Sequence, residues 1–198
     1  MRRDFDLDLK DGEKVEKEVA HLLSEKMKNL HYVEKVDHAR YPFDLRLTLK
    51  DKEGRHTDVN IEVKALEGRK FIHWGSKKIA EMMDTGVVEV WSDDYKQKRP
   101  HWFSDQTDII VFKNKARGKF YFYRAQPVIE HLKAWTGPLT YAKNDCDDTS
   151  GWLMKFYWSP DEAVHPRFRD ESMFLPGFMF SMDGIVEDEC PLDAPNYL

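Results

Sequence analysis

Two carboxylates and one ammonium group lie in neighbouring segments near the start of the sequence. Asp44 belongs to residues 43–49, and Glu62 and Lys64 belong to residues 58–64. Both segments alternate like strands, so Glu62 and Lys64 share a face. Paired carboxylates suit Mg²⁺, which keeps several waters and bridges to a substrate phosphate. An adjacent lysine can orient or deprotonate an attacking water and neutralise charge that builds on phosphorus. These residue types indicate metal-assisted hydrolysis of a phosphate ester.

A β-hairpin is expected to bring Asp44 beside Glu62 and Lys64. Residues 43–49 place four apolar side chains on one face, and the turn sequence Asp-Lys-Glu-Gly follows at 51–54. Apolar residues recur at helical spacing in 11–30, which predicts an amphipathic helix with Asp11 as its N-cap. Glu16, in an early turn of this helix, is the carboxylate best placed to complete the acidic cluster.

The rest of the pattern predicts an α/β fold, a mixed sheet with the first helix on one face. Strands are expected at residues 86–91, 107–112, 119–123 and 152–158, with 107–112 apolar enough to be central. A helix at 127–135, on the other side or at an edge, begins with proline and ends before Gly-Pro. Residues 1–160 are expected to form the domain, and the proline-rich residues 161–198 an irregular C-terminal extension with an acidic tail.

Composition narrows the function classes. The chain of 198 residues is 41% hydrophobic and 34% charged, which is typical of one folded domain. Its mean hydropathy is −0.70, and no apolar run approaches the roughly 18 residues of a membrane span. The two cysteines have neither zinc-type nor Cys-x-x-Cys spacing, and no secretory signal is visible, so a cytoplasmic location is expected. Nucleophile-elbow, phosphate-loop and dinucleotide motifs are also missing from the sequence.

The charges are unevenly distributed. The net charge of −5 is matched by the five acidic residues of positions 183–198, which contain no base. Residues 96–124 instead carry eight lysines and arginines against two aspartates. Lys96, Lys98, Arg99 and Trp102 interleave cations with an aromatic ring, which suits contact with a nucleic-acid backbone and stacking on a base. A solvated loop and strand edge is the alternative explanation of this strip.

The order of these elements resembles the PD-(D/E)xK nuclease superfamily. The resemblance spans residues 11–135 and rests on Gly12 with Glu16, Pro42-Phe43-Asp44, Glu62-Val63-Lys64, and the later segments 86–89 and 106–112. It implies that Asp44, Glu62 and the backbone carbonyl of Val63 bind Mg²⁺ or Mn²⁺, and that Lys64 assists the nucleophile. Phe43 separates Pro42 from Asp44, which departs from the signature. Glu13 and Glu18 are neighbouring alternatives to Glu16 as the helix acid.

The resemblance also implies a restriction endonuclease-like core and a DNA substrate. Hydrolysis would leave a 5′ phosphate and serve recombination, repair or phage DNA processing, with the protein in the host cytoplasm if phage-encoded. Two copies could pair as a homodimer. Resolvase-like and phage-encoded members of the superfamily are the most similar in their later strands.

Three other interpretations remain open at this point. The three charged residues could form a cross-strand salt bridge on an exposed hairpin. The protein could be a catalytically inactive member of the nuclease fold that binds DNA or a protein partner, or an unrelated α/β protein. Glu89 could be a further ligand or an ordinary strand carboxylate.

Overall fold

The computed structural model describes residues 5–37, 39–66, 85–92, 98–115, 117–143, 150–158 and 171–183. In chain order its elements are α1 (Phe5–Lys26), β1 (Leu30–Lys35), β2 (Leu45–Lys50), β3 (His56–Leu66), β4 (Thr85–Trp91), β5 (Ile109–Asn114), β6 (Lys119–Arg124), α3 (Ala125–Ala134), β7 (Thr140–Lys143), β8 (Ser150–Tyr157), the short 3₁₀ helix η3 (Glu171–Met173) and β9 (Phe178–Asp183). The fold is mixed α/β, as predicted. None of the described helices is both long and apolar enough to cross a bilayer.

The strands form two sheets. The main sheet has the order β1-β2-β3-β5-β6-β9, and all its neighbours are antiparallel except the parallel pair β3–β5. The second sheet has the order β4-β8-β7 and is antiparallel. The segment predicted at 86–91 therefore forms a strand, but it joins the second sheet. The segment predicted at 107–112 corresponds to β5, which is central and buried as expected.

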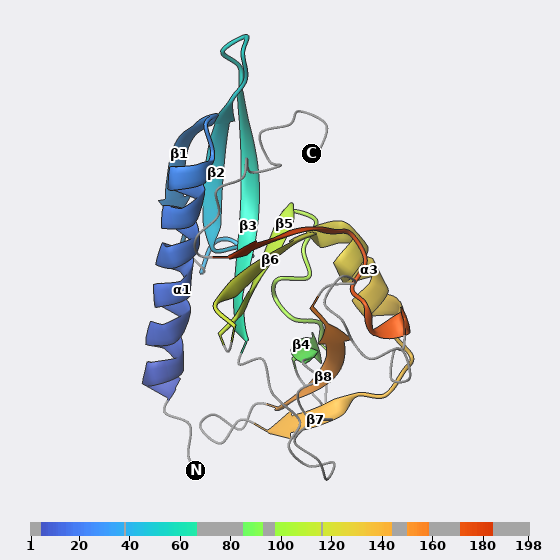
Figure 1. Ribbon diagram of the computed structural model, residues 1–198. Coiled ribbons are helices and arrows are strands. Elements are labelled where there is room, and N and C mark those ends of the chain that lie inside the picture. Colours follow the sequence, from blue (N-terminus) through green and yellow to red (C-terminus); the bar gives the residue numbers. More distant parts are fainter. Residues whose placement is uncertain are drawn as a thin grey trace.

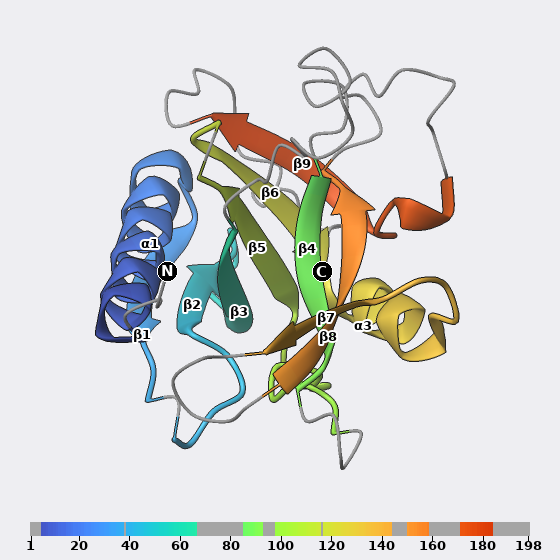
Figure 2. The ribbon, with the colours of Figure 1, turned by 90° about the horizontal axis from the view of Figure 1, so that it is seen from below.

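Each face of the main sheet has its own apolar core. Helix α1 packs Val19 and Leu23 against alternate residues of the sheet, including Leu47 and Ile61. On the opposite face, β5 and β6 pack against α3 and the second sheet, a layering that Figures 1 and 2 show from two directions. The expected placement of the two helices on opposite sides is confirmed. The corresponding face of β2 and β3 carries polar side chains, and the candidate site lies there.

The β2–β3 hairpin matches the prediction closely. Leu45 pairs with Ile61 and Lys50 with His56, and Gly54 takes a φ of 82° in the turn. This left-handed conformation is one that glycine adopts at little cost, which explains the turn sequence. Leu45, Leu47 and Leu49 are buried towards α1. Residues between them therefore face away from α1.

The first helix differs from the prediction at both ends. It begins at Phe5, not at Asp11, and ends at Lys26. Residues 5–10 contain neither proline nor glycine, so nothing in this segment stops the helix from extending. Asp11 is consequently inside the helix, where its carboxylate pairs with Lys115 Nζ at 3.0 Å.

The C-terminal extension is not irregular throughout. Within 161–198, residues 178–183 form β9 and pair antiparallel with β6. Phe178 packs against the α3-side core and Met179 against the α1-side core. Successive residues of β9 therefore contact the cores on both faces of the main sheet. The prolines on either side of this short alternating segment favoured its prediction as irregular. The extension therefore completes an edge of the main sheet.

The second sheet needs a glycine at position 86. A Cβ on Gly86 would lie 2.5 Å from Phe156 Cζ and 3.1 Å from Trp158 Cη2. We expect Gly86→Ala to lower the free energy of unfolding by about 1–3 kcal/mol, because buried aromatic rings must shift. Denaturant unfolding followed by tryptophan fluorescence measures this change.

Gly12→Ala is the matched control. It lies inside α1, where an added Cβ meets no atom within 4 Å, so alanine should stabilise the protein by about 0.5–1 kcal/mol. Equal effects of the two substitutions would contradict the packing described here.

Candidate active site

Asp44, Glu62 and Lys64 come together on one face of the main sheet. In the β3–β5 register Glu62 pairs with Ile110 and Lys64 with Phe112, and both partners belong to the core on the side away from α1. Asp44 immediately precedes β2, one residue before the inward-facing Leu45, so it faces the same side. Asp44 and Glu62 are each only 4% exposed. The sequence-predicted cluster is therefore assembled in a largely buried place.

Backbone and side-chain hydrogen bonds fix the position of Asp44. Its N–H donates to the Ile61 carbonyl at 2.9 Å, and its own carbonyl accepts from the Val36 N–H at 3.0 Å. Its Oδ2 accepts a hydrogen bond of 2.6 Å from the Val63 N–H. The pairing of β2 with β3 ends at Leu45–Ile61, so the Val63 N–H has no backbone partner in β2. The Asp44 carboxylate accepts its hydrogen bond instead. The side chain of Asp44 is thereby held across β3.

The burial of Glu62 next to Asp44 changes the protonation of Glu62. Burial raises the pKa of Glu62 to about 7, because Lys64 only partly offsets it and Asp44 adds a like charge and a hydrogen bond. Glu62 forms an ion pair with Lys64 Nζ. Burial alone would lower the pKa of Lys64, but Glu62, Asp44 and Glu89 together raise it. The site thus holds more negative charge than one lysine neutralises.

Residues from outside the hairpin also lie near Lys64. Its Nζ is 5.8 Å from the centre of the Trp102 ring, a cation–π distance. Burial raises the pKa of Glu89 on β4, and the charge of Lys64 opposes this shift. Glu89 was an open alternative in the sequence, and the structure brings it into electrostatic reach of the cluster.

Gly151 leaves room for the carboxylate of Glu89. A Cβ on Gly151 would lie 2.7 Å from Glu89 Oε1 and 2.9 Å from the Trp91 carbonyl oxygen. This glycine, isolated in an aromatic strand, is the signal in the sequence that could have strengthened the case for Glu89.

Glu16 is not brought to the cluster. It lies on α1, which covers the opposite face of the sheet, and its Oε2 pairs with Lys35 Nζ at 2.8 Å. The alternatives behave similarly, because Glu13 also pairs with Lys35 and Glu18 pairs with Lys113. These acids connect the helix to lysines of β1 and β5. Helical spacing from Gly12 identified Glu16, but it does not specify which face of the sheet the helix covers.

Within the described ranges, no three His, Cys, Asp or Glu side chains form a group that could hold a metal ion. Among the described residues, the carboxylates available for ligation at this cluster are therefore the pair Asp44 and Glu62, and the backbone of Val63 lies next to them between Glu62 and Lys64.

The described residues of the predicted nucleic-acid strip, Lys98, Arg99 and Trp102, do not share one exposed surface. Trp102 is 4% exposed and packs in the α3-side core, so its ring is not available for stacking on a base. Arg99 Nη2 donates to the Lys133 carbonyl at 3.0 Å, and its guanidinium lies 3.4 Å from the centre of the Trp91 ring. Lys98 is exposed, and Lys96 lies outside the described residues. Arg99 thus packs between Trp91 of β4 and the end of α3, which accounts for a cation in this aromatic segment of the sequence.

No family model, curated protein or solved structure matches the chain.

Glu62 makes the stability of the metal-free protein dependent on pH. Its pKa is about 7 when folded and near 4.5 when unfolded, so the folded state binds more protons between these values. The free energy of unfolding should therefore fall as pH rises from about 4.5 to 7. Glu62→Gln removes this dependence and should gain up to about 3 kcal/mol relative to the unsubstituted protein between pH 5 and pH 8. Denaturant unfolding in EDTA at both pH values tests this.

Glu130→Gln, an exposed change on α3, is the control and should show no such gain. An unchanged pH dependence in Glu62→Gln would mean that Glu62 is solvated or fully neutralised in the folded protein.

Arg99 should contribute to stability and not to DNA binding. Its guanidinium joins the Val90 carbonyl of β4 to the Leu132 and Lys133 carbonyls at the end of α3. Arg99→Ala is expected to cost about 1–3 kcal/mol of unfolding free energy, because these carbonyls lose a charged donor. Lys98→Ala, at the exposed neighbour, should change stability by less than about 0.5 kcal/mol. Weaker DNA binding by Arg99→Ala at unchanged stability would restore the sequence-based assignment.

Proposed function

We propose that this protein is a metal-dependent phosphodiesterase acting on DNA, with its active site at Asp44, Glu62 and Lys64. The observation that carries the proposal is the side-by-side burial of two carboxylates next to a single lysine. Such an arrangement costs free energy in the protein alone, as the raised pKa of Glu62 indicates. A bound divalent cation would balance the negative charge of Asp44 and Glu62 that Lys64 does not neutralise.

The donor set suits a hard cation. Asp44 and Glu62 offer only oxygen atoms, and Mg²⁺ characteristically uses one or two carboxylates and keeps several waters. The Val63 carbonyl lies in the same stretch of β3 and would complete the protein's share of the ligands. Bound Mg²⁺ or Mn²⁺ would lower the pKa of a water and polarise the phosphate.

The chain's own residues have separate roles in this proposal. The Val63 N–H holds Asp44 through Oδ2 and so fixes the orientation of its carboxylate. Lys64 would shift from Glu62 towards the reacting phosphate, where its ammonium group orients the attacking water and offsets charge developing on phosphorus. Trp102 packs beside Lys64 Nζ and restricts the positions that the ammonium group can take. Attack on phosphorus would expel the 3′ oxygen and leave a 5′ phosphate.

The architecture supports a restriction endonuclease-like core. Helix α1 is followed by the antiparallel strands β1, β2 and β3, and β5, which comes after β4 in the chain, lies parallel to β3 in the same sheet. Asp44 stands at the start of β2, and Glu62 and Lys64 stand on β3, as the resemblance to PD-(D/E)xK nucleases requires. DNA as the substrate, a homodimer, and a role in recombination, repair or phage DNA processing follow from that resemblance.

The alternative of an inactive binding protein depended on the basic strip. Arg99 is engaged with backbone carbonyls, and Lys113 and Lys115 pair with acids of α1. These ion pairs leave less positive charge for a partner than the sequence indicates. We therefore favour the enzyme.

Cleavage assays test the proposal. Labelled linear, nicked, branched and single-stranded DNA is incubated with the protein in Mg²⁺, Mn²⁺ or EDTA. We expect metal-dependent cleavage that Asp44→Asn and Lys64→Met each reduce by at least about 100-fold, because each removes a group that acts at the phosphate. Methionine retains the aliphatic packing of Lys64 beside Trp102.

Asp58→Asn is the matched control for Asp44→Asn. It makes the same chemical change on the same face of the hairpin, but Asp58 is exposed and its Oδ1 accepts a hydrogen bond from Thr48 at 2.8 Å. It should cleave at close to the unsubstituted rate. Well-folded protein that cuts none of the four DNA forms in either metal would exclude the nuclease assignment.

A further inference from the structure

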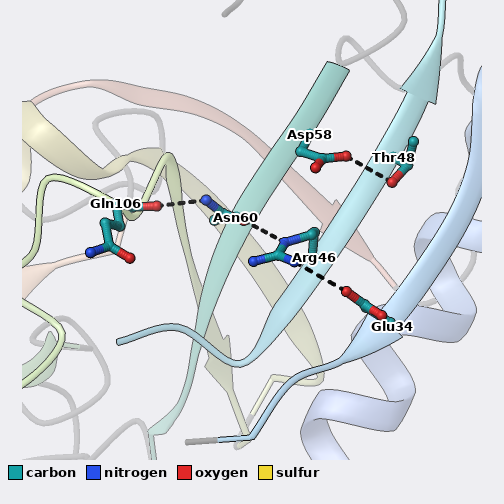
Figure 3. A network of polar contacts seen from close by, with 6 residues as sticks. All are labelled: Glu34, Arg46, Thr48, Asp58, Asn60 and Gln106. Carbon is teal, nitrogen blue, oxygen red and sulfur yellow. Dashed lines mark hydrogen bonds and ion pairs between the residues drawn. The ribbon is translucent and has the colours of Figure 1, made fainter. Parts of the chain in front are cut away.

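Arg46 lies directly beside the candidate catalytic pair. It follows Asp44 by two residues along β2, and its partner across the hairpin is Asn60, two residues before Glu62 on β3. Side chains two residues apart point to the same face, so Arg46 and Asn60 form the next row, about 7 Å along the strands. Figure 3 shows Arg46 between Asn60 and Glu34 across three neighbouring strands.

The guanidinium of Arg46 is held in place mainly by aromatic rings. It lies 5.0 Å from the centre of the Tyr41 ring and 5.5 Å from that of Phe43. Its hydrogen bonds are long, with Nε donating to Asn60 Oδ1 and Nη1 donating to Glu34 Oε1, both at 3.4 Å. Bonds of this length are at the weak end of the range. The guanidinium of Arg46 is therefore held in position, although its N–H groups make only weak hydrogen bonds.

Asn60 is itself oriented by its neighbours. Its Nδ2 donates to the Gln106 carbonyl at 2.9 Å, a contact also drawn in Figure 3, and its N–H donates to Asp108 Oδ2 at 2.8 Å. The amide oxygen of Asn60 is thus directed towards Arg46. The loop before β5, which contains Gln106 and Asp108, therefore holds Asn60 in place beside Arg46.

A structural role accounts for only part of this arrangement. The side chains of Arg46 and Glu34 are 27% and 38% exposed, and partly exposed ion pairs of this kind contribute about 0–1 kcal/mol. In the part of the chain that the structure describes, Nη2 of Arg46 has no hydrogen-bond partner. A planar guanidinium with spare donors, packed near two aromatic rings, is suited to a phosphate group.

We propose that Arg46 binds the DNA phosphate next to the one that is cleaved. This inference rests on the proposed function, because it places the DNA strand along β2 and β3 and through the Asp44–Glu62 pair. Asn60 positions the guanidinium, and Glu34 competes with the phosphate for it. Arg46 is thus a substrate-binding residue of the same site.

Binding of a labelled DNA oligonucleotide tests the role of Arg46. Fluorescence anisotropy in Ca²⁺ and in EDTA, over a series of salt concentrations, compares Arg46→Ala and Arg46→Gln with the unsubstituted protein. We expect both to bind at least about tenfold more weakly and to reduce the slope of log affinity against log salt by about one. Arg46→Gln keeps much of the stem over the two rings, so it separates lost charge from lost packing.

Arg55→Ala is the matched control. Arg55 lies on the same hairpin and also pairs with acids, Asp51 and Glu53, but it stands beside the turn away from the candidate site. It should change DNA affinity by less than about twofold, since exposed charges far from a site are screened by salt.

A second pair of variants gives an effect of opposite sign. Glu34→Gln should strengthen DNA binding by about two- to threefold, because it releases Arg46 and removes a negative charge beside the strand. Glu53→Gln makes the same change next to Arg55 and should leave the affinity unaltered. A purely structural Arg46 predicts no gain from Glu34→Gln.

The outcomes separate this inference from the proposed function. Metal-dependent cleavage together with unchanged binding by both Arg46 variants would overturn the role of Arg46 and leave the nuclease intact. Binding that depends on Arg46, without cleavage by the unsubstituted protein in any metal, would support the phosphate contact and exclude the nuclease. Equal losses in Arg46→Ala and Arg55→Ala, or no DNA binding by the unsubstituted protein, would also overturn the inference.

Discussion

The burial of two carboxylates beside one lysine is the constraint on which the rest of the site depends. Asp44 and Glu62 are almost fully removed from solvent, and a hydrogen bond from the Val63 N–H fixes how Asp44 faces β3. Burying like charges close together is unfavourable unless a cation balances them. The β2–β3 hairpin brings this arrangement about, and the ion pair with Lys64 and the raised pKa of Glu62 follow from it. The proposal of a divalent-cation site rests on this excess of negative charge.

The second sheet gives the cluster a setting that the hairpin alone could not provide. Residues of β4 and of the segment before β5 reach Lys64 from outside β2 and β3, with Glu89 adding charge and Trp102 adding an aromatic surface. Two glycines permit this packing, Gly86 beneath Phe156 and Gly151 beside Glu89. The low dielectric and restricted access of such a setting strengthen the electrostatic interactions of Lys64. The further row of Arg46 and Asn60 then extends the polar face along the hairpin.

Some charged side chains join elements of the fold and others lie at the surface, and the amino-acid composition does not distinguish the two groups. Acids of α1 pair with Lys35 of β1, with Lys113 of β5 and with Lys115, which directly follows β5, so these charges join the helix to the sheet. Arg99 is likewise directed inwards. By contrast, Arg46 follows Asp44 along β2, and its hydrogen bonds to Asn60 and Glu34, both long, use only Nε and Nη1. Position on a face of the sheet decides these roles, and net charge does not.

The elements that depend on local pattern can be predicted from the amino-acid sequence. Alternation over residues 43–49 and 58–64 and the turn at 51–54 were sufficient to place Asp44, Glu62 and Lys64 on one face, because strand periodicity and turn geometry are short-range properties. The long-range relations between elements become visible in the folded structure alone. It placed Glu16 on the opposite face, buried Trp102, moved β4 into a second sheet and recruited residues 178–183 as β9. These outcomes depend on which surfaces pack together across the whole chain, and no local spacing specifies that.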